Sequence, residues 1–216
     1  MASEIPSFEF EQALWQQGIL HVAGIDEAGR GALAGPVVAA ALIAPPFSAL
    51  DGVWAEVRDS KKLSPAQRER LEPIIQQQSL AWGVGAVDAE IIDQIGIAPA
   101  TKRAMRLAVA ALSVQPTFLL IDWVKLPEIA VAQQSMPKAD LRIATVAAAS
   151  ILAKVHRDRI MTEYATLYPN YGFASHKGYG AAAHLAAIEQ FGGCPIHRHS
   201  FAPLIQPKLF DNENSW

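Results

Sequence analysis

Two adjacent carboxylates, Asp26 and Glu27, follow the apolar segment 20–25 and precede a glycine-flanked arginine in Gly29-Arg30-Gly31. Acids at the end of a strand beside a flexible loop can bind a metal ion or take part in acid–base chemistry. The same residue types are common in a polar hairpin turn, because Asp and Gly are ordinary turn residues. The sequence therefore leaves a metal site and a simple turn as two interpretations of this stretch.

A third acid, Asp122, ends the compact apolar run 117–121, which is the best candidate for a central strand. If this strand lies beside strand 20–25, the carboxylates of Asp26 and Asp122 can meet at one edge of the sheet. Open α/β sheets bind ligands at the carboxyl ends of their strands, and Mg²⁺ is usually held by one or two carboxylates. The alternative is that Asp122 only terminates the strand, although residues 123–125 are not a typical turn sequence.

Two of the acids pose questions of geometry. Successive residues on a regular strand point to opposite faces, so Glu27 can join Asp26 only if the strand ends, bulges or twists there. The glycines that follow make such a distortion feasible. Asp158 lies within a predicted helix, four residues after Lys154, and could simply pair with that lysine on the surface. A helix packed over the sheet edge would instead bring Asp158 to the other acids.

Three segments could bind an anionic backbone. Gly29-Arg30-Gly31 exposes backbone N–H groups that a side chain would otherwise shield. Ser60, Lys61 and Lys62 place a hydroxyl and two ammonium groups just before a predicted helix start. Tyr179 lies in the glycine-rich loop 175–180, where it could stack on a base or a sugar. The alternatives are a turn, a capped helix with solvated lysines, and a buried tyrosine that closes a loop.

A zinc site is not expected. Cys194, His197 and His199 lack an obvious fourth ligand, and their spacing matches no common zinc finger. The segment 197–199 is more simply interpreted as part of a basic surface.

Composition narrows the class of protein. The chain has 216 residues, 51% of them hydrophobic and 18% charged, with a net charge of -3, which excludes global disorder and gives no overall sign of nucleic-acid binding. Between residues 141 and 210, however, bases outnumber acids, so a local basic face is expected. One cysteine excludes an intrachain disulfide, the N-terminus lacks the features of a signal peptide, and the apolar runs are too short to span a membrane. We predict a cytoplasmic protein with no membrane association.

The elements that must position these residues mix strands and helices. The expected strands are 20–25, 36–44, 80–87 and 117–121, and a fifth could lie at 141–144. The main expected helices are 65–78, 97–112, 145–168 and 181–191. This order predicts an α/β domain with a mixed sheet that is antiparallel at first and parallel after a helical crossover.

Several segments carry a resemblance to a known family. They are 24–31 with 33–36, Asp59-Ser60-Lys61-Lys62-Leu63, Leu120-Ile121-Asp122, 147–155 with Arg157-Asp158-Arg159, 171–173 with 176–180, and 200–203. Each is weak alone, but together, and in this order, they resemble bacterial ribonuclease HII, the type 2 ribonuclease H family. The resemblance spans roughly residues 20–205.

The resemblance implies a ribonuclease H-like α/β fold, in which helices flank a mixed five-stranded sheet and a helical C-terminal extension follows. On this basis we divide the chain into a lead-in, 1–18, a catalytic domain, 19–167, and an extension packed on that domain, 168–216. The implied activity is endonucleolytic cleavage of RNA in RNA/DNA hybrids and at ribonucleotides embedded in duplex DNA. Cleavage would fall 5′ to the ribonucleotide and leave 3′-hydroxyl and 5′-phosphate ends.

The resemblance also implies roles for individual residues. The catalytic acids would be Asp26, Glu27, Asp122 and Asp158, of which the first three would bind Mg²⁺ or Mn²⁺. The substrate-binding residues would be Gly29, Arg30, Gly31, Ser60, Lys61, Lys62 and Tyr179. Two such ions, about 3.5–4 Å apart, can activate a water, stabilise the leaving oxygen and neutralise the phosphate. Without metal, the clustered carboxylates would raise one another's pKa.

Two positions depart from the pattern usual in the family. Trp123 follows Asp122 where a smaller residue is expected, which would crowd the metal site. Residues 181–183 are all alanine, where relatives usually begin with Thr. We expect a monomer, and the tail 204–216 contains no clear motif for a protein partner.

Two rival interpretations remain at this point. One is a metal-dependent phosphoryl-transfer enzyme that acts on small molecules, which the extended basic and aromatic region 154–199 disfavours. The other is a nucleic-acid-binding module whose acids bind only structural metal. Convergent acids that face DNA would repel it without a catalytic purpose, and this repulsion disfavours the second rival.

Overall fold

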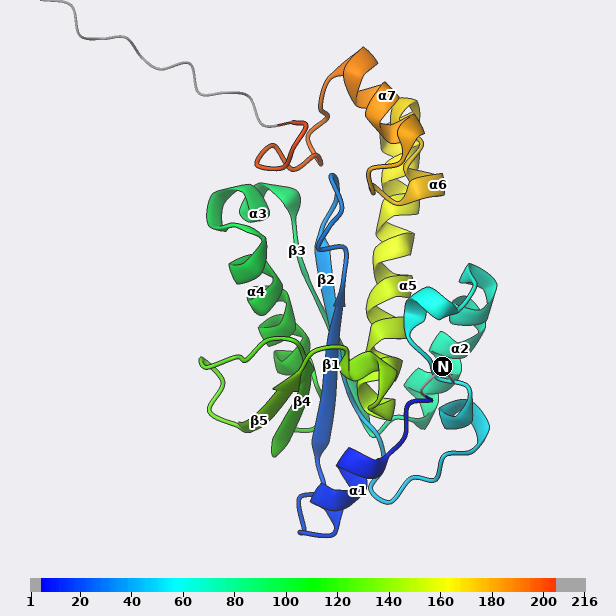
Figure 1. The fold of residues 1–216 in the computed structure, drawn as a ribbon, viewed down its shortest axis with the longest axis vertical. Coiled ribbons are helices and arrows are strands. Elements are labelled where there is room, and N and C mark those ends of the chain that lie inside the picture. The colour runs from blue at the N-terminus through cyan, green and yellow to red at the C-terminus, as the bar shows by residue number, and fades with distance from the viewer. Residues whose placement is uncertain (1–4, 205–216) are drawn as a thin grey trace, which may run out of the picture.

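A mixed five-stranded sheet forms the centre of the protein, which the computed structural model describes from residue 5 to residue 204 (Figure 1). The strands are β1 (Val22–Ala28), β2 (Val37–Ile43), β3 (Ala81–Val87), β4 (Phe118–Asp122) and β5 (Ala132–Met136). Their order across the sheet is β3-β2-β1-β4-β5. The β1–β2 and β2–β3 pairs are antiparallel, and the β1–β4 and β4–β5 pairs are parallel. The predicted mixed sheet, with the strands that carry Asp26 and Asp122 as neighbours, is therefore confirmed.

The burial of each strand follows from its composition. β2 reads Val-Val-Ala-Ala-Ala-Leu-Ile and is buried along its whole length, as expected for a strand covered on both faces. β3 lies at an edge of the sheet and alternates between buried and more exposed residues, with Trp82 among the exposed ones. The strands that carry Asp26 and Asp122, β1 and β4, thus lie inside the sheet, between β2 and β5.

Helices cover both faces of the sheet (Figure 1). On one face, α3 (Ala89–Ile95) and α4 (Ile97–Ala110) share an apolar core with the side chains of Ile25 and Ile121. On the other face, α1 (Glu9–Trp15), α2 (Pro65–Gln78) and α5 (Ala144–Leu167) bury a second core. Apolar side chains removed from water on both faces supply the main stabilisation of this three-layer arrangement.

Short elements complete the fold. The 3₁₀ turns are η1 (Gly52–Ala55), η2 (Ser60–Lys62), η3 (Ala139–Leu141) and η4 (Pro169–Tyr171). After α5 come α6 (Phe173–His176) and α7 (Ala182–Phe191), which lie with the far end of α5 in Figure 1. A third apolar cluster, which includes Met161 of α5 and the buried Phe173, joins these helices to α5.

The fifth strand differs from the expectation. Residues 141–144 contribute to η3 and to the start of α5, and the fifth strand is β5. The sequence of β5, Ala-Gln-Gln-Ser-Met, is polar because the strand lies at the sheet edge and is largely accessible to solvent. An apolar run is therefore a poor guide to this strand.

None of the helices between residues 5 and 204 has the length and apolar content needed to span a lipid bilayer.

Candidate active site

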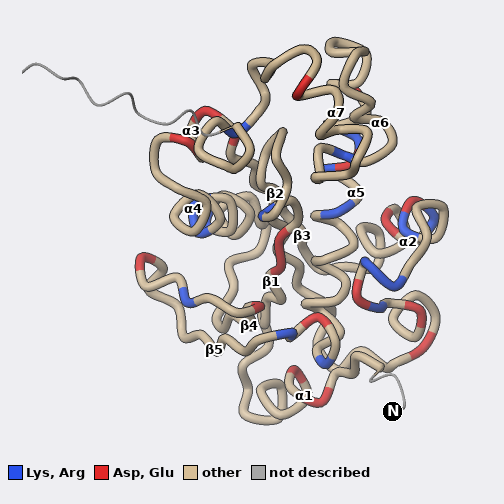
Figure 2. The backbone as a smooth tube through the Cα atoms, turned by 45° about the horizontal axis from the view of Figure 1, so that its top comes forward, with Lys and Arg blue, Asp and Glu red and all other residues tan. Residues whose placement is uncertain are grey.

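Three of the predicted acids converge at one edge of the sheet. Asp26, Glu27 and Asp122 each offer a carboxylate oxygen, and these oxygens lie within 4.8 Å of one another. The parallel pairing of β1 and β4 aligns Ile25 with Ile121, so the residues that follow both of them reach the same level of the sheet. In Figure 2 the acidic segments of β1 and β4 lie on these neighbouring strands. Asp26 and Glu27 lie within β1, so the polar-turn interpretation is wrong for these two acids, whereas Arg30 and Gly31 do form a turn.

Glu27 joins this group without any break in β1. The strand continues to Ala28, and Asp26, Glu27 and Ala28 all pair regularly with β2, so the expected distortion at Glu27 is absent. Instead, β4 ends at Asp122 and leaves the neighbouring edge of β1 open. The Glu27 N–H donates to Asp26 Oδ1 at 2.7 Å, and the Glu27 carboxylate accepts from Trp123 Nε1. The Glu27 carboxylate therefore lies beside the first residue that follows β4.

The electrostatics of these acids show mutual repulsion. Burial, followed by the charges of Glu27, Asp122 and Asp140, raises the pKa of Asp26 well above its ordinary value. Burial also raises the pKa of Glu27, although the hydrogen bond from Trp123 and the charge of Arg30 act in the opposite direction. A bound cation would stabilise the ionised form of these carboxylates, because it relieves both their mutual repulsion and the cost of their desolvation.

A fourth acid, Asp140, belongs to the same neighbourhood and was missed in the sequence. It is 6% exposed and lies in η3, directly after Ala139, whose N–H donates to Asp122 Oδ1 at 2.9 Å. Burial, then the charges of Asp59 and Asp122, raise its pKa to about 6. The available signal was an acid shortly before the predicted helix 145–168, which the expected strand at 141–144 obscured.

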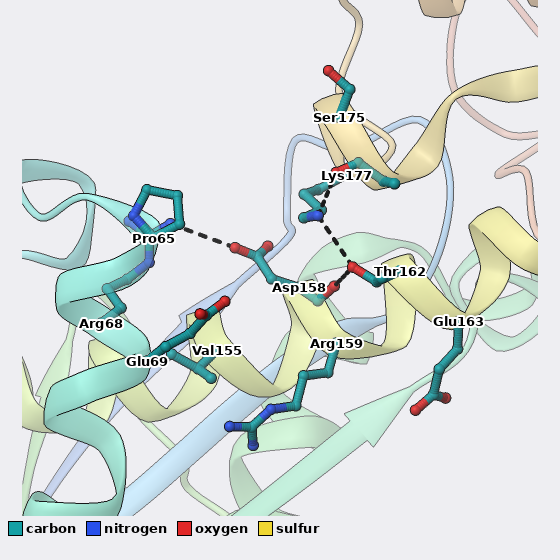
Figure 3. Close-up of a pocket in the computed structure, with 11 residues that line it drawn as sticks. Pro65, Arg68, Glu69, Val155, Asp158, Arg159, Thr162, Glu163, Ser175 and Lys177 are labelled. Atoms are coloured by element: carbon teal, nitrogen blue, oxygen red, sulfur yellow. Dashed lines mark hydrogen bonds and ion pairs between the residues drawn. The ribbon is translucent and has the colours of Figure 1, made fainter.

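Asp158 lies in a different environment from the one predicted. It is not a member of the acid cluster found among residues 5–204. Its carboxylate accepts from Lys154 Nζ at 2.7 Å and lies 3.5 Å from Arg68 NH2. Figure 3 shows it directed toward α2 across a cavity of about 570 Å³ between α2, α5 and α6. The i, i+4 pairing with Lys154, left open as the alternative, is the one observed.

Two buried arginines shape the glycine loop that follows β1. Gly29 has φ +92°, and a Cβ there would lie 2.0 Å from Arg157 Nε, so both the backbone and the space require glycine. Arg157 donates to the carbonyls of Ala34, Pro36 and Lys177. Arg198 donates twice to the Gly35 carbonyl and once to that of Arg30. Arg198 is fully buried, so the expected basic surface at 197–199 is wrong for this residue.

The predicted phosphate-binding residues lie beside the acids. Lys61 and Lys62 are exposed in η2, whereas Ser60 is buried and its N–H donates to Ser150 Oγ. Although burial lowers the pKa of Lys61, the charges of Asp59, Asp140, Asp26 and Asp122 raise it above its ordinary value. The Lys61 ammonium group therefore lies within electrostatic reach of these carboxylates.

Tyr179 is adjacent to the glycine loop. Its neighbour Gly178 accepts a hydrogen bond from Leu33 N at 2.8 Å, which ties loop 177–180 to loop 29–35. Tyr179 is 36% exposed, and Arg157 Cζ lies 5.1 Å from the centroid of its ring. One face of the ring is thus supported by the protein while part of it remains accessible.

His184, Cys194 and His197 form a buried structural cluster. His184 Nδ1 is 2.9 Å from the Tyr179 carbonyl, and its Nε2 is 3.0 Å from His197 Nε2. His197 directs its other ring nitrogen to Cys194, with an Nδ1–Sγ distance of 3.1 Å. Burial, followed by the charge of His184, lowers the pKa of His197 to about 4, so the ring is neutral at pH 7. Through the contact between His184 and the Tyr179 carbonyl, this cluster supports the loop 175–180 that carries Tyr179.

The donor set at the sheet edge suits a hard divalent cation. Oxygen ligands from carboxylates are those that Mg²⁺ and Mn²⁺ prefer. Buried carboxylates with raised pKa values, beside exposed lysines, can hold such an ion next to a phosphate. This arrangement is suited to phosphodiester hydrolysis.

Comparison with known proteins identifies the family. The model of the family described as Ribonuclease HII matches residues 23–204. The chain is 51% identical over 211 residues to Ribonuclease HII of Dehalococcoides mccartyi, covering 97% of this chain and 98% of the relative. It is 53% identical over 194 residues to Ribonuclease HII of Geobacter sulfurreducens, covering 90% of this chain and 88% of the relative.

Solved structures agree with this assignment. The ribonuclease H2 of Pyrococcus horikoshii OT3 superimposes with a TM-score of 0.72 at 26% identity, over 85% of this chain and 94% of that one. Bst-RNase HIII in complex with Mn²⁺ gives a TM-score of 0.64 at 23% identity, over 89% of this chain and 70% of that one, and shows the shared fold. This chain therefore belongs to the ribonuclease HII family and is a nuclease that acts on RNA/DNA hybrids.

Proposed function

We propose that this enzyme hydrolyses the phosphodiester 5′ to ribonucleotides, both in RNA/DNA hybrids and within duplex DNA, and so initiates ribonucleotide removal. The observation that carries the proposal is the convergence of three carboxylates, with oxygens within 4.8 Å of one another. They lie beside the glycine loop, because Glu27 contacts Arg30 of that loop at 3.4 Å. The products would be 3′-hydroxyl and 5′-phosphate ends.

Asp26, Glu27 and Asp122 would hold Mg²⁺ or Mn²⁺, with Asp140 as the fourth acid in the place that the sequence assigned to Asp158. The chemistry that two such ions supply when bound is activation of a water and neutralisation of the charge that develops on the phosphate. The protein's own contribution is orientation. The Ala139 N–H directs Asp122 and the Glu27 N–H directs Asp26, so both carboxylates are arranged before substrate arrives.

The glycine loop would detect the ribose. Gly29 is required by the packing of Arg157, but a Cβ on Gly31 would meet no described residue within 4 Å. The fold of residues 5–204 therefore does not require glycine at 31, whereas a nucleic-acid backbone that approaches closely would. A 2′-hydroxyl distinguishes RNA from DNA, and backbone groups of Gly29-Arg30-Gly31 can hydrogen-bond to it.

The remaining contacts would position the duplex. Tyr179 would stack on the deoxyribose next to the ribonucleotide, supported by Arg157 behind its ring. Lys61 and Lys62 would contact phosphates. Ser60 is buried, so we propose that it acts through the loop that carries the two lysines. The expectation of a monomeric enzyme stays a prediction.

A DNA duplex that contains one ribonucleotide tests this function. With Mg²⁺ or Mn²⁺, the wild-type protein should cut once, on the 5′ side of the ribonucleotide, and Asp26→Asn should abolish cleavage while duplex binding survives. Asp51→Asn changes an exposed carboxylate outside the site and is the matched control, with unchanged activity expected. A folded wild-type protein that leaves this duplex uncut, or an Asp26→Asn variant with full activity, would refute the proposal.

A further inference from the structure

Trp123 occupies an unusual backbone position beside the acids. It follows Asp122 at the point where the chain leaves β4, and its φ of +52° lies in the left-handed region. Its N–H donates to the Met136 carbonyl at 3.0 Å, and the next N–H returns to the Asp122 carbonyl at 2.7 Å. This conformation is a genuine outlier for a bulky residue, so its cost must be offset by contacts of the side chain.

The indole makes two contacts with groups of the proposed site. Its Nε1–H lies 3.1 Å from both carboxylate oxygens of Glu27. Its ring lies under the Arg30 guanidinium, with Cζ 3.8 Å from the ring centroid. Arg30 NH1 in turn lies 3.4 Å from Glu27 Oε1, which closes a three-residue cluster.

Glu27 has a specific need for such a partner. It points to the face of the sheet opposite to Asp26, since the two are successive residues of a regular strand. Its carboxylate nevertheless has an oxygen within 4.8 Å of the carboxylate oxygens of Asp26 and Asp122. The Trp123 Nε1–H lies beyond the end of β4 and bonds to both carboxylate oxygens. It therefore restrains the Glu27 side chain in this position.

Arg30 has a corresponding need. It lies between two glycines and its side chain is 41% exposed, so its own loop gives it little support. Its buried Nε makes no hydrogen bond to any residue between 5 and 204. The face of Trp123 supports the guanidinium by a cation–π contact and leaves part of that group available to an incoming substrate.

We infer that Trp123 is a positioning residue with two separable tasks. Its N–H holds Glu27 in the orientation that binds the metal, and its ring holds Arg30 in place for the ribonucleotide-containing strand. This inference rests on the proposed function of the acid cluster. It also reverses the expectation of crowding, because the large residue supports the metal ligand.

Two substitutions separate the tasks. Trp123→Phe keeps an aromatic face and removes the N–H, so Mn²⁺ affinity should fall by roughly tenfold, as for the loss of other groups that orient metal ligands. With Mn²⁺ saturating, the KM for the duplex should change by less than about twofold, because Arg30 keeps its platform. Trp123→Gly suits the positive φ and removes both contacts, so it should lose Mn²⁺ affinity and also raise KM by roughly fivefold.

Mn²⁺ binding to the metal-free protein is measured by the electron paramagnetic resonance signal of free Mn²⁺, together with thermal unfolding of each variant. Trp82→Phe, at the exposed sheet edge, is the matched control and should leave both properties unchanged. If Trp123→Phe keeps the wild-type Mn²⁺ affinity while Asp26→Asn loses Mn²⁺ binding, the first task of Trp123 is refuted and the proposed function stands. Unchanged KM in Trp123→Gly would overturn the second. Unchanged Mn²⁺ binding in Asp26→Asn would refute the proposed function itself.

Discussion

At the scale of single residues, Asp140 and Asp158 show how environment decides what a carboxylate can do. Asp158 is already neutralised, since Lys154 donates to it at 2.7 Å and Arg68 lies 3.5 Å away. Asp140 is buried near Asp59 and Asp122, and these surroundings raise its pKa to about 6. A cation relieves repulsion at Asp140, whereas at Asp158 it would have to displace two existing partners. We therefore expect Asp140 to act in catalysis.

Substitution of the two acids should give opposite patterns. Asp140→Asn should lower kcat/KM by roughly 100-fold or more, which corresponds to about 2.7 kcal/mol of transition-state stabilisation. Asp158→Asn should keep kcat/KM within about tenfold and lower the free energy of unfolding by about 1 kcal/mol, because its ion pairs are lost. Cleavage kinetics and thermal unfolding measure both effects. Full activity in Asp140→Asn, with activity lost in a stable Asp158→Asn, would restore the assignment made from sequence.

The sequence predicts the positions of some acids of the site and not of others. Asp26 and Asp122 follow apolar runs, and neighbouring strands bring such residues together. The direction in which a helical side chain faces depends on how the helix packs. For Asp158, the four-residue spacing from Lys154 does not reveal that packing. Asp140 approaches Asp122 only through the left-handed turn at Lys138 and the hydrogen bond from Ala139, and both are tertiary features.

At the scale of elements, α1 helps to hold the start of α5. Glu11 is fully buried, and its Oε1 accepts from both the N–H and the hydroxyl of Thr145, near the α5 N-terminus. The second oxygen, Oε2, has no partner among residues 5–204. Burial raises the pKa of Glu11 to about 7, although the hydrogen bonds from Thr145 act against this shift. The lead-in is therefore coupled to α5, the helix that carries Arg157 and its contacts with the glycine loop.

This coupling predicts a pH dependence of stability. The folded protein holds the Glu11 proton up to about pH 7, whereas an unfolded chain releases it near 4.5. Stability from this group is therefore greatest at low pH and is lost as the pH rises through the folded value. Glu11→Gln keeps the acceptor oxygen without the ionisation, so its free energy of unfolding relative to wild type should rise by on the order of 2 kcal/mol between about pH 5 and pH 8.

Chemical denaturation of both proteins across this pH range provides the measurement. Glu9→Gln changes an exposed residue of the same helix and serves as the control. A difference between Glu11→Gln and wild type that stays constant with pH would show that Glu11 titrates normally in the folded state.

The strands that the sequence predicts best are those with buried apolar runs, such as β2 and β4, and the worst is the polar edge strand β5. The predicted helix 145–168 agrees with α5, Ala144–Leu167, to within one residue at each end. The predicted strand 20–25 is too short at its end, because β1 continues through two carboxylates past the last residue of β4 that pairs with it. Strand ends depend on pairing, which local composition does not contain.

At the scale of the whole molecule, the C-terminal segment completes the site that the sheet begins. Arg157 and Arg198, both fully buried, bind carbonyls of loop 29–36 and of Lys177. Asp93 of α3 accepts from the backbone N–H groups of His199 and Ser200, which attaches this segment to the opposite side of the sheet. The proposed metal ligands thus come from the sheet and η3, whereas the proposed substrate contacts depend on residues far along the chain.

We propose that Asp26, Glu27 and Asp122 at one sheet edge, together with Asp140 of the adjoining η3, form a metal site. Crystals of the protein soaked in Mn²⁺ test it most directly, through the anomalous difference density of the ion. We expect Mn²⁺ bound by carboxylate oxygens of Asp26, Glu27 and Asp122, with Asp140 facing the ions and Asp158 still paired with Lys154 and Arg68. Mn²⁺ density at Asp158, or none among the four acids at a concentration that supports cleavage, would contradict it.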